Sequence, residues 1–394
     1  MHAVLPLAML FLIRLAPGIA FQSAAVAAPV MSRALGLNHA QLGLALGAFM
    51  LPGIVVTVPA GLLARRLGDR FVLCGGSALV AAGAVLASQS GSVAALLAGR
   101  ALGGAGGVAV LMLTIKMVTD RYAGPWLSTA SAIIITSWPA SLALGLVLLG
   151  PVPVWLGWRA TFGIAALPAL LAILLIPFVG RAASPTATGP STAPSKPPRL
   201  RFVLGAVLSW SLINAVLTVL AGFLPGYFVS LGRPIETAAA TASLAVWTSA
   251  AAIPFGGLLA DRLLGRRLAV VLGVTATGCL ALAVSATGGP GLLLILLIVL
   301  LGLAFAVAPG SLTAQLGQAT PAASRAVVFG WYSAGSYAAM TVAPPIAGWL
   351  RDLTNAAGAP IVFAAGCSFA ALASYALMLA GVPVRRSTLA TPNG

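Results

Sequence analysis

Long apolar runs alternate with short polar connections along almost the whole chain. A helix needs about 20 mainly apolar residues to cross the hydrocarbon core of a membrane, and runs of this length occur twelve times in the 394 residues. The pattern predicts an all-α polytopic membrane protein whose transmembrane helices lie at residues 5–29, 40–63, 71–90, 93–116, 126–150, 157–179, 202–230, 237–260, 268–287, 291–316, 325–349 and 359–382.

One polar segment is much longer than the other connections and lies between the sixth and seventh apolar runs. Its sequence, RAASPTATGPSTAPSKPPRL, is rich in proline, serine, threonine and alanine. This composition buries too little apolar surface to fold by itself and is typical of a surface linker. We therefore predict an N-terminal six-helix half at 1–180, a cytoplasmic linker at 181–201 and a C-terminal six-helix half at 202–394.

The two predicted halves contain a repeated loop. PAGLLARRLGDR at 59–70 follows the second span, and FGGLLADRLLGRR at 255–267 follows the eighth span, at an offset of 196 residues. Repeated six-helix units with matched loops imply an internal pseudo-two-fold axis, and in such proteins the ligand site lies between the units.

The composition supports a membrane location. The chain is 60% hydrophobic and only 7% charged, whereas soluble domains are about 25% charged. Its net charge of +16 would suggest nucleic-acid binding in a soluble protein. Here the basic residues form short clusters between apolar spans, which is how orientation in a lipid bilayer is encoded, so no nucleic-acid partner is expected.

Basic residues are distributed unequally between the two sides of the predicted bundle. Four lie on one side: Arg33, Arg159, Arg233 and Arg351. Fifteen lie on the other: Arg65, Arg66, Arg70, Lys116, Arg121, Arg181, Lys196, Arg199, Arg201, Arg262, Arg266, Arg267, Arg325, Arg385 and Arg386. Under the positive-inside rule the richer side is cytoplasmic, which predicts an inner-membrane protein with both termini in the cytoplasm.

The second copy of the repeated loop has the most specific pattern in the chain. A glycine is followed by an acid four residues later, an arginine, and then a second glycine with two basic residues: Gly257, Asp261, Arg262, Gly265, Arg266 and Arg267. Together with the twelve spans and the basic linker, this loop resembles the major facilitator superfamily of secondary transporters. Leu264 is one residue more than the family pattern contains.

The first copy of the loop departs from that pattern. It retains Gly61, Arg66, Gly68 and Arg70, but Arg65 occupies the position of the acid, and Asp69 follows one helical turn later. In the family the acid braces the closed cytoplasmic side against the N-terminus of a neighbouring helix. The resemblance therefore implies gating roles for Gly61, Asp69, Arg70, Gly257, Asp261, Arg262 and Arg266; the alternative is a basic cluster that only fixes topology.

Two further segments resemble the same family. GRALGGAGG at 99–107 is similar to its fourth-span motif, in which closely spaced glycines let helices approach. Arg100 there is predicted among the gating residues; it either binds backbone carbonyls in a structural role or contacts the substrate. The segment at 115–139 looks like the junction between the fourth and fifth spans of bacterial permeases of the cyanate or nitrate type.

Arg14 is the candidate that points to a substrate. It lies in FLIRLAPGIAFQS, about nine residues inside the first span and so near the bilayer midplane. Pro17 and Gly18 follow it and are expected to break the helix ladder at the same depth. All five acids fall outside the membrane interior: Asp69, Asp120, Asp261, Asp352 and Glu236. Arg14 must therefore bind backbone carbonyls, water or an anionic ligand.

Helical spacing suggests polar partners for Arg14 in a central cavity. Gln22 lies on the flank of its face, and polar residues recur on single faces of three later spans. The predicted substrate-binding set is Arg14, Gln22, Asn214, Thr218, Thr248, Tyr332 and Ser336. The alternative for each of these polar groups is a hydrogen bond between helices.

No enzymatic constellation is present in the sequence. Both histidines lie outside the apolar spans, no nucleophile is paired with a base, and no phosphate-binding GxxxxGK[ST] occurs. We therefore predict no enzyme activity, catalytic residue, cofactor or metal. The predicted function is secondary transport of a small solute, expected to be a small anion, by a monomer that works by alternating access. The sequence does not decide whether a proton is co-transported or a counter-anion is exchanged. An exporter of hydrophobic drug-like compounds and a membrane receptor or scaffold are the alternatives.

Overall fold

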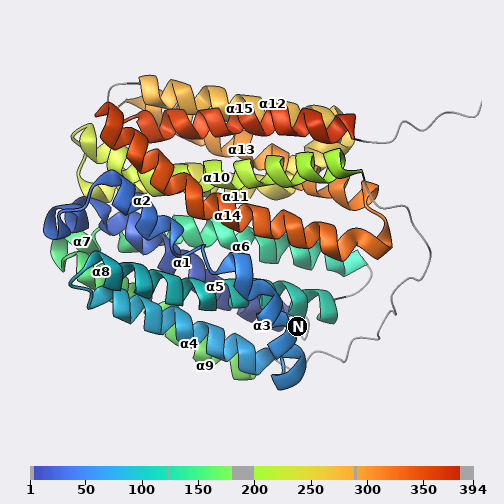
Figure 1. Cartoon of the computed structure of the whole chain (residues 1–394), viewed down its shortest axis with the longest axis horizontal. Coiled ribbons are helices and arrows are strands. Elements are labelled where there is room, and N and C mark those ends of the chain that lie inside the picture. Colours follow the sequence, from blue (N-terminus) through green and yellow to red (C-terminus); the bar gives the residue numbers. More distant parts are fainter. Residues whose placement is uncertain (1–3, 123–124, 180–198, 288–290, 382–394) are drawn as a thin grey trace, which may run out of the picture.

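A computed structural model describes residues 4–122, 125–179, 199–287 and 291–381. Within these ranges the chain is helical throughout, with no strand (Figure 1). The helices are α1 (Val4–Leu35), α2 (His39–Gly47), α3 (Gly53–Leu67), α4 (Asp69–Ser88), α5 (Val93–Arg121), α6 (Pro125–Leu149), α7 (Val152–Trp155), α8 (Trp158–Ala165), α9 (Leu167–Leu175), α10 (Leu200–Ser230), α11 (Ile235–Leu259), α12 (Arg266–Ala286), α13 (Leu292–Ala319), α14 (Ala322–Thr354) and α15 (Ala359–Ala380).

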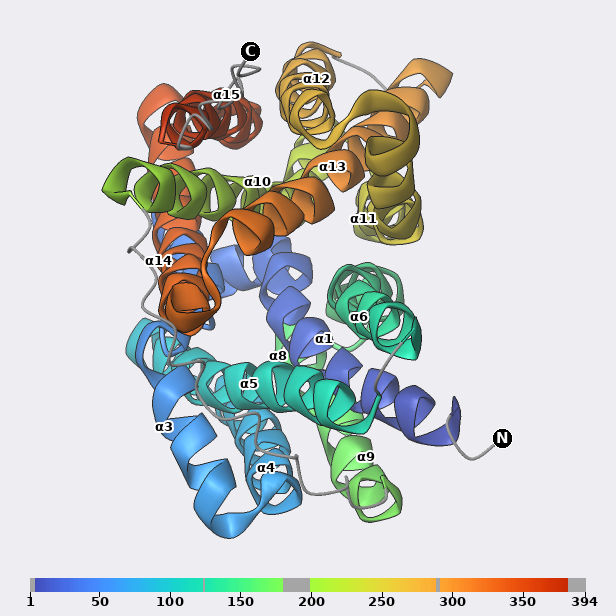
Figure 2. The same ribbon diagram turned by 90° about the vertical axis from the view of Figure 1, so that its right-hand side faces the viewer.

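The helices pack as two bundles that lie against each other. Figure 2 shows α1, α3 to α6, α8 and α9 in one bundle and α10 to α15 in the other. The all-α membrane fold with two halves is thus confirmed. The residue limits of the halves stay a prediction, since 181–198 of the predicted linker lie outside the described residues.

Ten helical stretches of the described chain are long and apolar enough to cross a membrane. The predicted second and eleventh spans are not among them. A continuous second span at 40–63 was the wrong expectation, because the chain forms α2 and α3 with an irregular turn at 48–52. Pro52, which has no N–H, stands at the start of α3. The eleventh span is α14, whose serines and tyrosines make it less apolar.

The first helix is not broken at Pro17 and Gly18, so the expected opening of its ladder is also wrong. Helix α1 runs through both residues. A Cβ on Gly18 would overlap the Ser141 side chain on α6, and the Pro17 ring packs against Gly107 on α5. These residues serve close helix packing, and proline is tolerated inside membrane helices whose neighbours compensate for the lost hydrogen bond.

The repeated loops have the same backbone geometry. Gly68 and Gly265 each precede a helix, with φ of 91° and 76° and ψ of 147° and 140°. The residue that is extra in the second copy, Leu264, ends a π-helical turn at Ala260–Leu264. A π-helical turn has one more residue per hydrogen-bonded ring than an α-helix. It therefore absorbs the insertion and returns the second glycine to its matched position.

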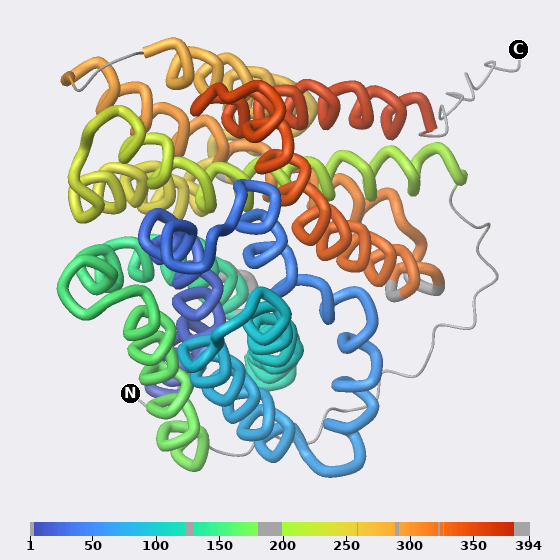
Figure 3. The backbone as a smooth tube through the Cα atoms, turned by 60° about the vertical axis from the view of Figure 1, so that its left-hand side comes forward, coloured from blue at the N-terminus to red at the C-terminus, as the bar shows by residue number. Residues whose placement is uncertain are grey.

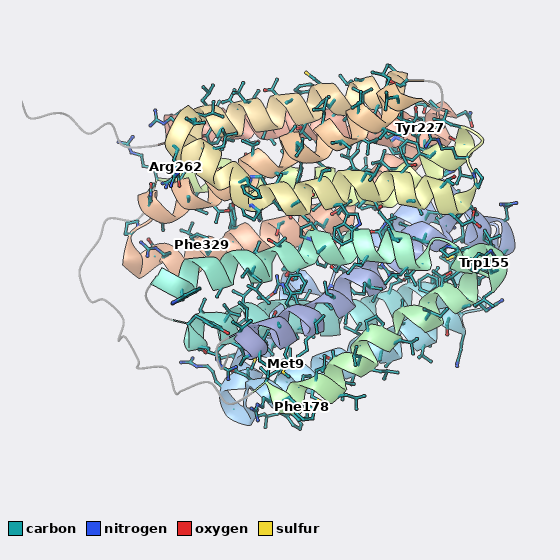
Figure 4. All side chains as sticks on the ribbon, turned by 180° about the vertical axis from the view of Figure 1, so that it is seen from behind. Met9, Trp155, Phe178, Tyr227, Arg262 and Phe329 are labelled. Atoms are coloured by element: carbon teal, nitrogen blue, oxygen red, sulfur yellow. The ribbon has the colours of Figure 1, made fainter. Side chains whose placement is uncertain are left out.

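The bundle has two distinct ends. At one end, which we call the linker end, Phe178 follows α9 and α10 begins. We call the opposite end the His39 end. Figure 4 shows Arg262, Phe329 and Phe178 at the linker end, and Trp155 and Tyr227 at the His39 end.

The two halves contact each other closely at the His39 end. Helix α2 lies along the last part of α14 (Figure 3). A Cβ on Gly43 would overlap the Pro344 carbonyl, and a Cβ on Gly348 would overlap the His39 carbonyl. Small residues allow this approach of two helix backbones, and it closes the path between the halves at this end.

We expect Gly68→Ala to destabilise the fold by about 1–3 kcal/mol, because a Cβ is strained at positive φ with extended ψ. Gly75→Ala is the matched control, since Gly75 lies within α4 and a Cβ added there would meet no other atom within 4 Å. Unfolding of both variants in detergent measures the difference. Equal stability of the two variants would contradict the requirement for glycine at 68.

Candidate substrate-binding site

Arg14 lies inside the N-terminal half, between α1 and α5. It is ten residues after Val4, or about 15 Å along the helix, and only 6% exposed. Its Nη1 donates hydrogen bonds to the Leu111 carbonyl and to Thr114 Oγ1, the second at 2.9 Å. The Thr114 hydroxyl in turn donates to the Val110 carbonyl at 2.8 Å. One terminal nitrogen of the guanidinium is thus fixed to α5.

One further donor of the Arg14 guanidinium, Nε, is buried and has no hydrogen-bond partner in the described chain. The chain has five acids, and they lie at helix ends or in the loops that join helices. The positive charge of Arg14 therefore has backbone and hydroxyl contacts but no negative partner.

A tyrosine of the C-terminal half approaches Arg14. Tyr337 on α14 lies within electrostatic range of the Arg14 guanidinium, and no hydrogen bond joins the two side chains in the described part of the chain. The Tyr337 ring also packs on Gly53, where a Cβ would overlap it. Arg14 therefore faces the region where the two halves meet, although it is bonded within one of them.

Arg100 has a different environment from Arg14. Its Nε donates to the Ala45 carbonyl at 2.8 Å, Nη1 to the Ala20 carbonyl at 2.6 Å, and Nη2 to the Phe21 carbonyl at 2.9 Å. Its guanidinium also lies 4.7 Å from the centre of the Phe49 ring, a distance typical of a cation–π contact. The sequence suggested a structural role in which Arg100 binds backbone carbonyls, and these hydrogen bonds are of that kind. They join α5 to α1 and α2. A gating role for Arg100 stays a prediction.

Gln22 makes a contact between the two halves. Its Nε2 donates to the Ala221 carbonyl on α10 at 2.8 Å, and its Oε1 is buried without a partner among the described residues. Helices α1 and α10 both begin at the linker end. Arg14 lies eight residues before Gln22 on α1, and Asn214 lies seven residues before Ala221 on α10. Asn214 thus lies at about the depth of Arg14.

The other predicted cavity residues bond mainly within their own helices. Asn214 donates to the Trp210 carbonyl, Thr218 to Asn214, Thr248 to Leu244, and Ser336 to Ser333. Tyr332 stacks on Trp210 at 4.9 Å and contacts Thr313 Oγ1 at 3.1 Å. None of these hydrogen bonds reaches Arg14, so a binding role for these five residues is still a prediction.

Apart from Arg100, the predicted gating residues lie at the linker end, and each ion pair there joins residues of one half. Lys116 Nζ bridges Asp69 at 2.7 Å and Asp120 at 2.8 Å. Asp261 pairs with Arg266 Nε at 2.6 Å.

The remaining four gating candidates show no contact between halves. Arg70 is partly buried, with an Nε that lacks a partner in the described chain, and Arg262 is exposed. The Cα of Gly61 lies near Met112, whereas Gly257 faces open space.

One contact between the halves was missed by sequence reasoning. Asp352, near the end of α14, accepts hydrogen bonds from the amides of His39 and Ala40 at the start of α2 and contacts His39 Nδ1 at 2.6 Å. Burial tends to raise the pKa of Asp352, but the hydrogen bonds from Ala40 and His39 outweigh it and lower the pKa below its usual value. The partners are 313 residues apart, so only the capping pattern around Asn38 and Gln41 was visible in the sequence.

The fold agrees with a comparison to known sequences. The sequence model of the Major Facilitator Superfamily matches residues 10–240 and 206–393, which together cover almost the whole chain. The chain belongs to the Major Facilitator Superfamily. It is therefore a transporter of a small-molecule substrate rather than an enzyme, as the sequence predicts.

Two relatives are similar over most of their length. The inner membrane transport protein YajR of Escherichia coli strain K12 is 26% identical over 353 residues, which cover 86% of this chain and 74% of YajR. A chloramphenicol resistance protein of Streptomyces lividans is 31% identical over 337 residues, covering 79% of this chain and 78% of the relative.

Solved superfamily structures have the same fold. The xylose transporter XylE of E. coli, in an inward open conformation, has a TM-score of 0.74 at 15% identity and covers 97% of both chains. A bacterial homolog of the human lysosomal transporter Spinster, inward-facing and occupied, has a TM-score of 0.73 at 16% identity, with 95% of this chain and 94% of that chain covered.

We expect Arg100→Gln to lower the free energy of unfolding by about 2–3 kcal/mol, since it removes several interhelical hydrogen bonds and leaves their carbonyls unpaired. Arg14→Gln should cost less, because fewer bonds are lost and an uncompensated charge is removed. Thermal melting in detergent compares the two variants. A larger loss for Arg14→Gln would show that Arg14 is mainly structural.

The Asp352 contact should depend on pH. Because the pKa of Asp352 is lower in the folded chain, its contribution to stability is present above the usual carboxyl value of about 3.9 and disappears as the pH falls through the lowered value. The wild type should exceed Asp352→Asn in melting temperature near neutral pH, and the difference should shrink below about pH 4. A difference that does not change with pH would contradict this assignment.

Proposed function

We propose that this chain is a secondary active transporter that moves a small anion by alternating access and binds it at Arg14. The observation that carries the proposal is a buried guanidinium whose Nε has no partner in the described chain and whose charge has no carboxylate nearby.

The energetics favour an anionic ligand. An arginine near the middle of a bilayer costs about 2.5–3.5 kcal/mol on insertion scales. Two bonds from one Arg14 nitrogen satisfy part of its donor capacity, whereas an anion would satisfy Nε and neutralise the charge. The Tyr337 hydroxyl of the other half is a second group that donates a hydrogen bond to the same anion in this proposal. A ligand that contacts both halves binds one conformation better than the other and so shifts their equilibrium.

The packing between the halves supports alternating access. The His39 end is closed by α2 against α14, by Asp352 and by Gln22. With both termini and the linker in the cytoplasm of an inner-membrane protein, as the basic residues predict, this closed end faces outward and the structure is the inward-facing state.

The linker end offers a gate for the opposite state. We assign gating to Asp69 with its partner Lys116, and to Asp261 with Arg266, since each pair lies within one half and is free to form new contacts when the halves approach. Gly61, Arg70, Gly257 and Arg262 belong to the same gate on the resemblance alone. A gating role of Arg100 also rests on the resemblance, but Arg100 bonds α1 and α2 away from the linker end. A monomer suffices, because Arg14 and Tyr337 come from one chain.

Coupling follows from the absence of an acid in the interior. The five acids lie at helix ends or in connecting loops, so a proton would have to travel on the substrate itself. Exchange for a counter-anion is the other route that needs no buried carboxylate.

A second candidate function has a specific observation in its favour. A relative that is 31% identical over most of both chains is a chloramphenicol resistance protein. Export of a hydrophobic drug-like compound is therefore the alternative proposal, and it does not require a charge at Arg14.

Anion uptake into proteoliposomes tests the proposal, with nitrate and formate as probes. Arg14→Gln should weaken uptake roughly 10–150-fold in kcat/KM, the equivalent of about 1.5–3 kcal/mol for a charge-assisted contact, and Arg14→Lys should retain more activity. Arg159→Gln is the control, because Arg159 lies at the His39 end, where it bonds Ser90.

Full nitrate and formate uptake by Arg14→Gln would refute the binding role of Arg14. Chloramphenicol export that survives in this variant, together with no anion uptake by the wild type, would establish the alternative.

A further inference from the structure

A pocket opens between the halves at the His39 end, far from Arg14. Its volume is about 230 Å³, and it is bounded by α1 and α2 of one half and by α10 and α14 of the other. Gln22 and Ala221, whose contact joins α1 to α10, lie on the same two helices, closer to the membrane centre. The pocket is therefore a vestibule on the outer side of the closed contact.

The rim of this vestibule is cationic. Arg33 comes from α1 and Arg351 from α14, and the His39 ring lies beside them. Arg33 Nε donates to the Pro29 carbonyl at 3.1 Å, which leaves its terminal nitrogens for solvent or a ligand. Arg351 is half-buried beside Gly226, and only the charge of Asp352 compensates it among the described groups.

The one acid nearby is already occupied. Asp352 does not line the pocket; both of its oxygens accept hydrogen bonds from the start of α2, and Oδ1 also contacts His39. The pocket lining itself contains no carboxylate. A ligand that enters thus meets two guanidinium groups, of which Arg351 is partly compensated by the charge of Asp352 from outside the pocket lining.

The arginines are also unusual for their side of the membrane. Only four basic residues lie on the predicted outer side, and two of them, Arg33 and Arg351, meet at this one pocket. The positive-inside rule disfavours basic residues there, so membrane orientation gives no reason for either of them.

The floor of the vestibule is apolar. Leu42 and Leu46 of α2 and Phe223 of α10 lie below the rim. A ligand matching both parts has a single carboxylate and a small hydrophobic body, since apolar pockets with a few charged groups fix orientation in this way. Inorganic anions match the rim but gain nothing from the floor.

We propose that this vestibule is a second anion site, distinct from Arg14, that binds small amphipathic monocarboxylates from the outer side. Because Arg33 and Arg351 belong to different halves, the bound carboxylate joins them and stabilises the closed outer end. Such a ligand favours the inward-facing state by its differential affinity. The site stands or falls independently of transport through Arg14.

Protection from thiol modification tests the site directly, with benzoate as the probe. Ser230 lines the pocket and is exposed, so Ser230→Cys is introduced into a chain in which Cys74, Cys279 and Cys367 are replaced by alanine. Thr354→Cys, exposed at the same end outside the pocket, is the control. Benzoate should slow modification of Ser230→Cys by a membrane-impermeant methanethiosulfonate several-fold and leave Thr354→Cys unchanged; acetate should protect less.

Variants of the charged residues decide the assignment. Arg351→Gln and Arg33→Gln should each abolish protection, Arg351→Lys should retain it, and Arg14→Gln should leave it intact. Absence of protection in the parent chain, or protection that persists in both glutamine variants, would overturn the vestibule site. Loss of protection in Arg14→Gln alone would show that benzoate acts through the central site. Monodisperse elution of each variant verifies that it is folded.

Discussion

A positive charge enclosed by membrane helices without an acidic partner is the constraint on which the rest of this structure depends. Arg14 is 6% exposed, and α5 supplies it with one carbonyl and one hydroxyl. The five acids, at helix ends and in loops, cannot neutralise it. The charge therefore remains available at the junction of the two halves, where Tyr337 approaches from the other side.

The two buried arginines of the N-terminal half, Arg14 and Arg100, differ in their hydrogen bonding. Arg100 distributes its donors over three carbonyls and lies over an aromatic ring, so it ties helices together and has little capacity for a ligand. Arg14 retains an unpaired Nε. Both arginines are buried, and they differ in the number of donors that the protein satisfies.

Much of the fold could be predicted from the sequence, because apolar runs and the repeated loop are local patterns. Even Leu264 was visible as an insertion, which the π-helical turn explains. The break between α2 and α3 occurs where Pro52 precedes α3, whereas the continuity of α1 at Pro17 depends on packing against α5 and α6. Helical spacing found the polar face of Asn214 but not its contacts, and no local pattern joins His39 to Asp352. Tyr337 directly follows the predicted Ser336 on α14, but adjacent residues of a helix point in different directions, so the spacing that selected Ser336 did not select Tyr337.

Thermal stabilisation by a panel of small anions tests whether Arg14 binds the substrate. Melting of the purified chain is measured in the Arg351→Gln background, which removes the contribution of the vestibule, with and without Arg14→Gln. A ligand that binds only the folded chain raises apparent stability by RT ln(1 + [L]/Kd), where [L] is the free ligand concentration. The account predicts that a small monoanion such as nitrate or formate raises the melting temperature in a concentration-dependent way only when Arg14 is present. Equal shifts with and without Arg14 would contradict it.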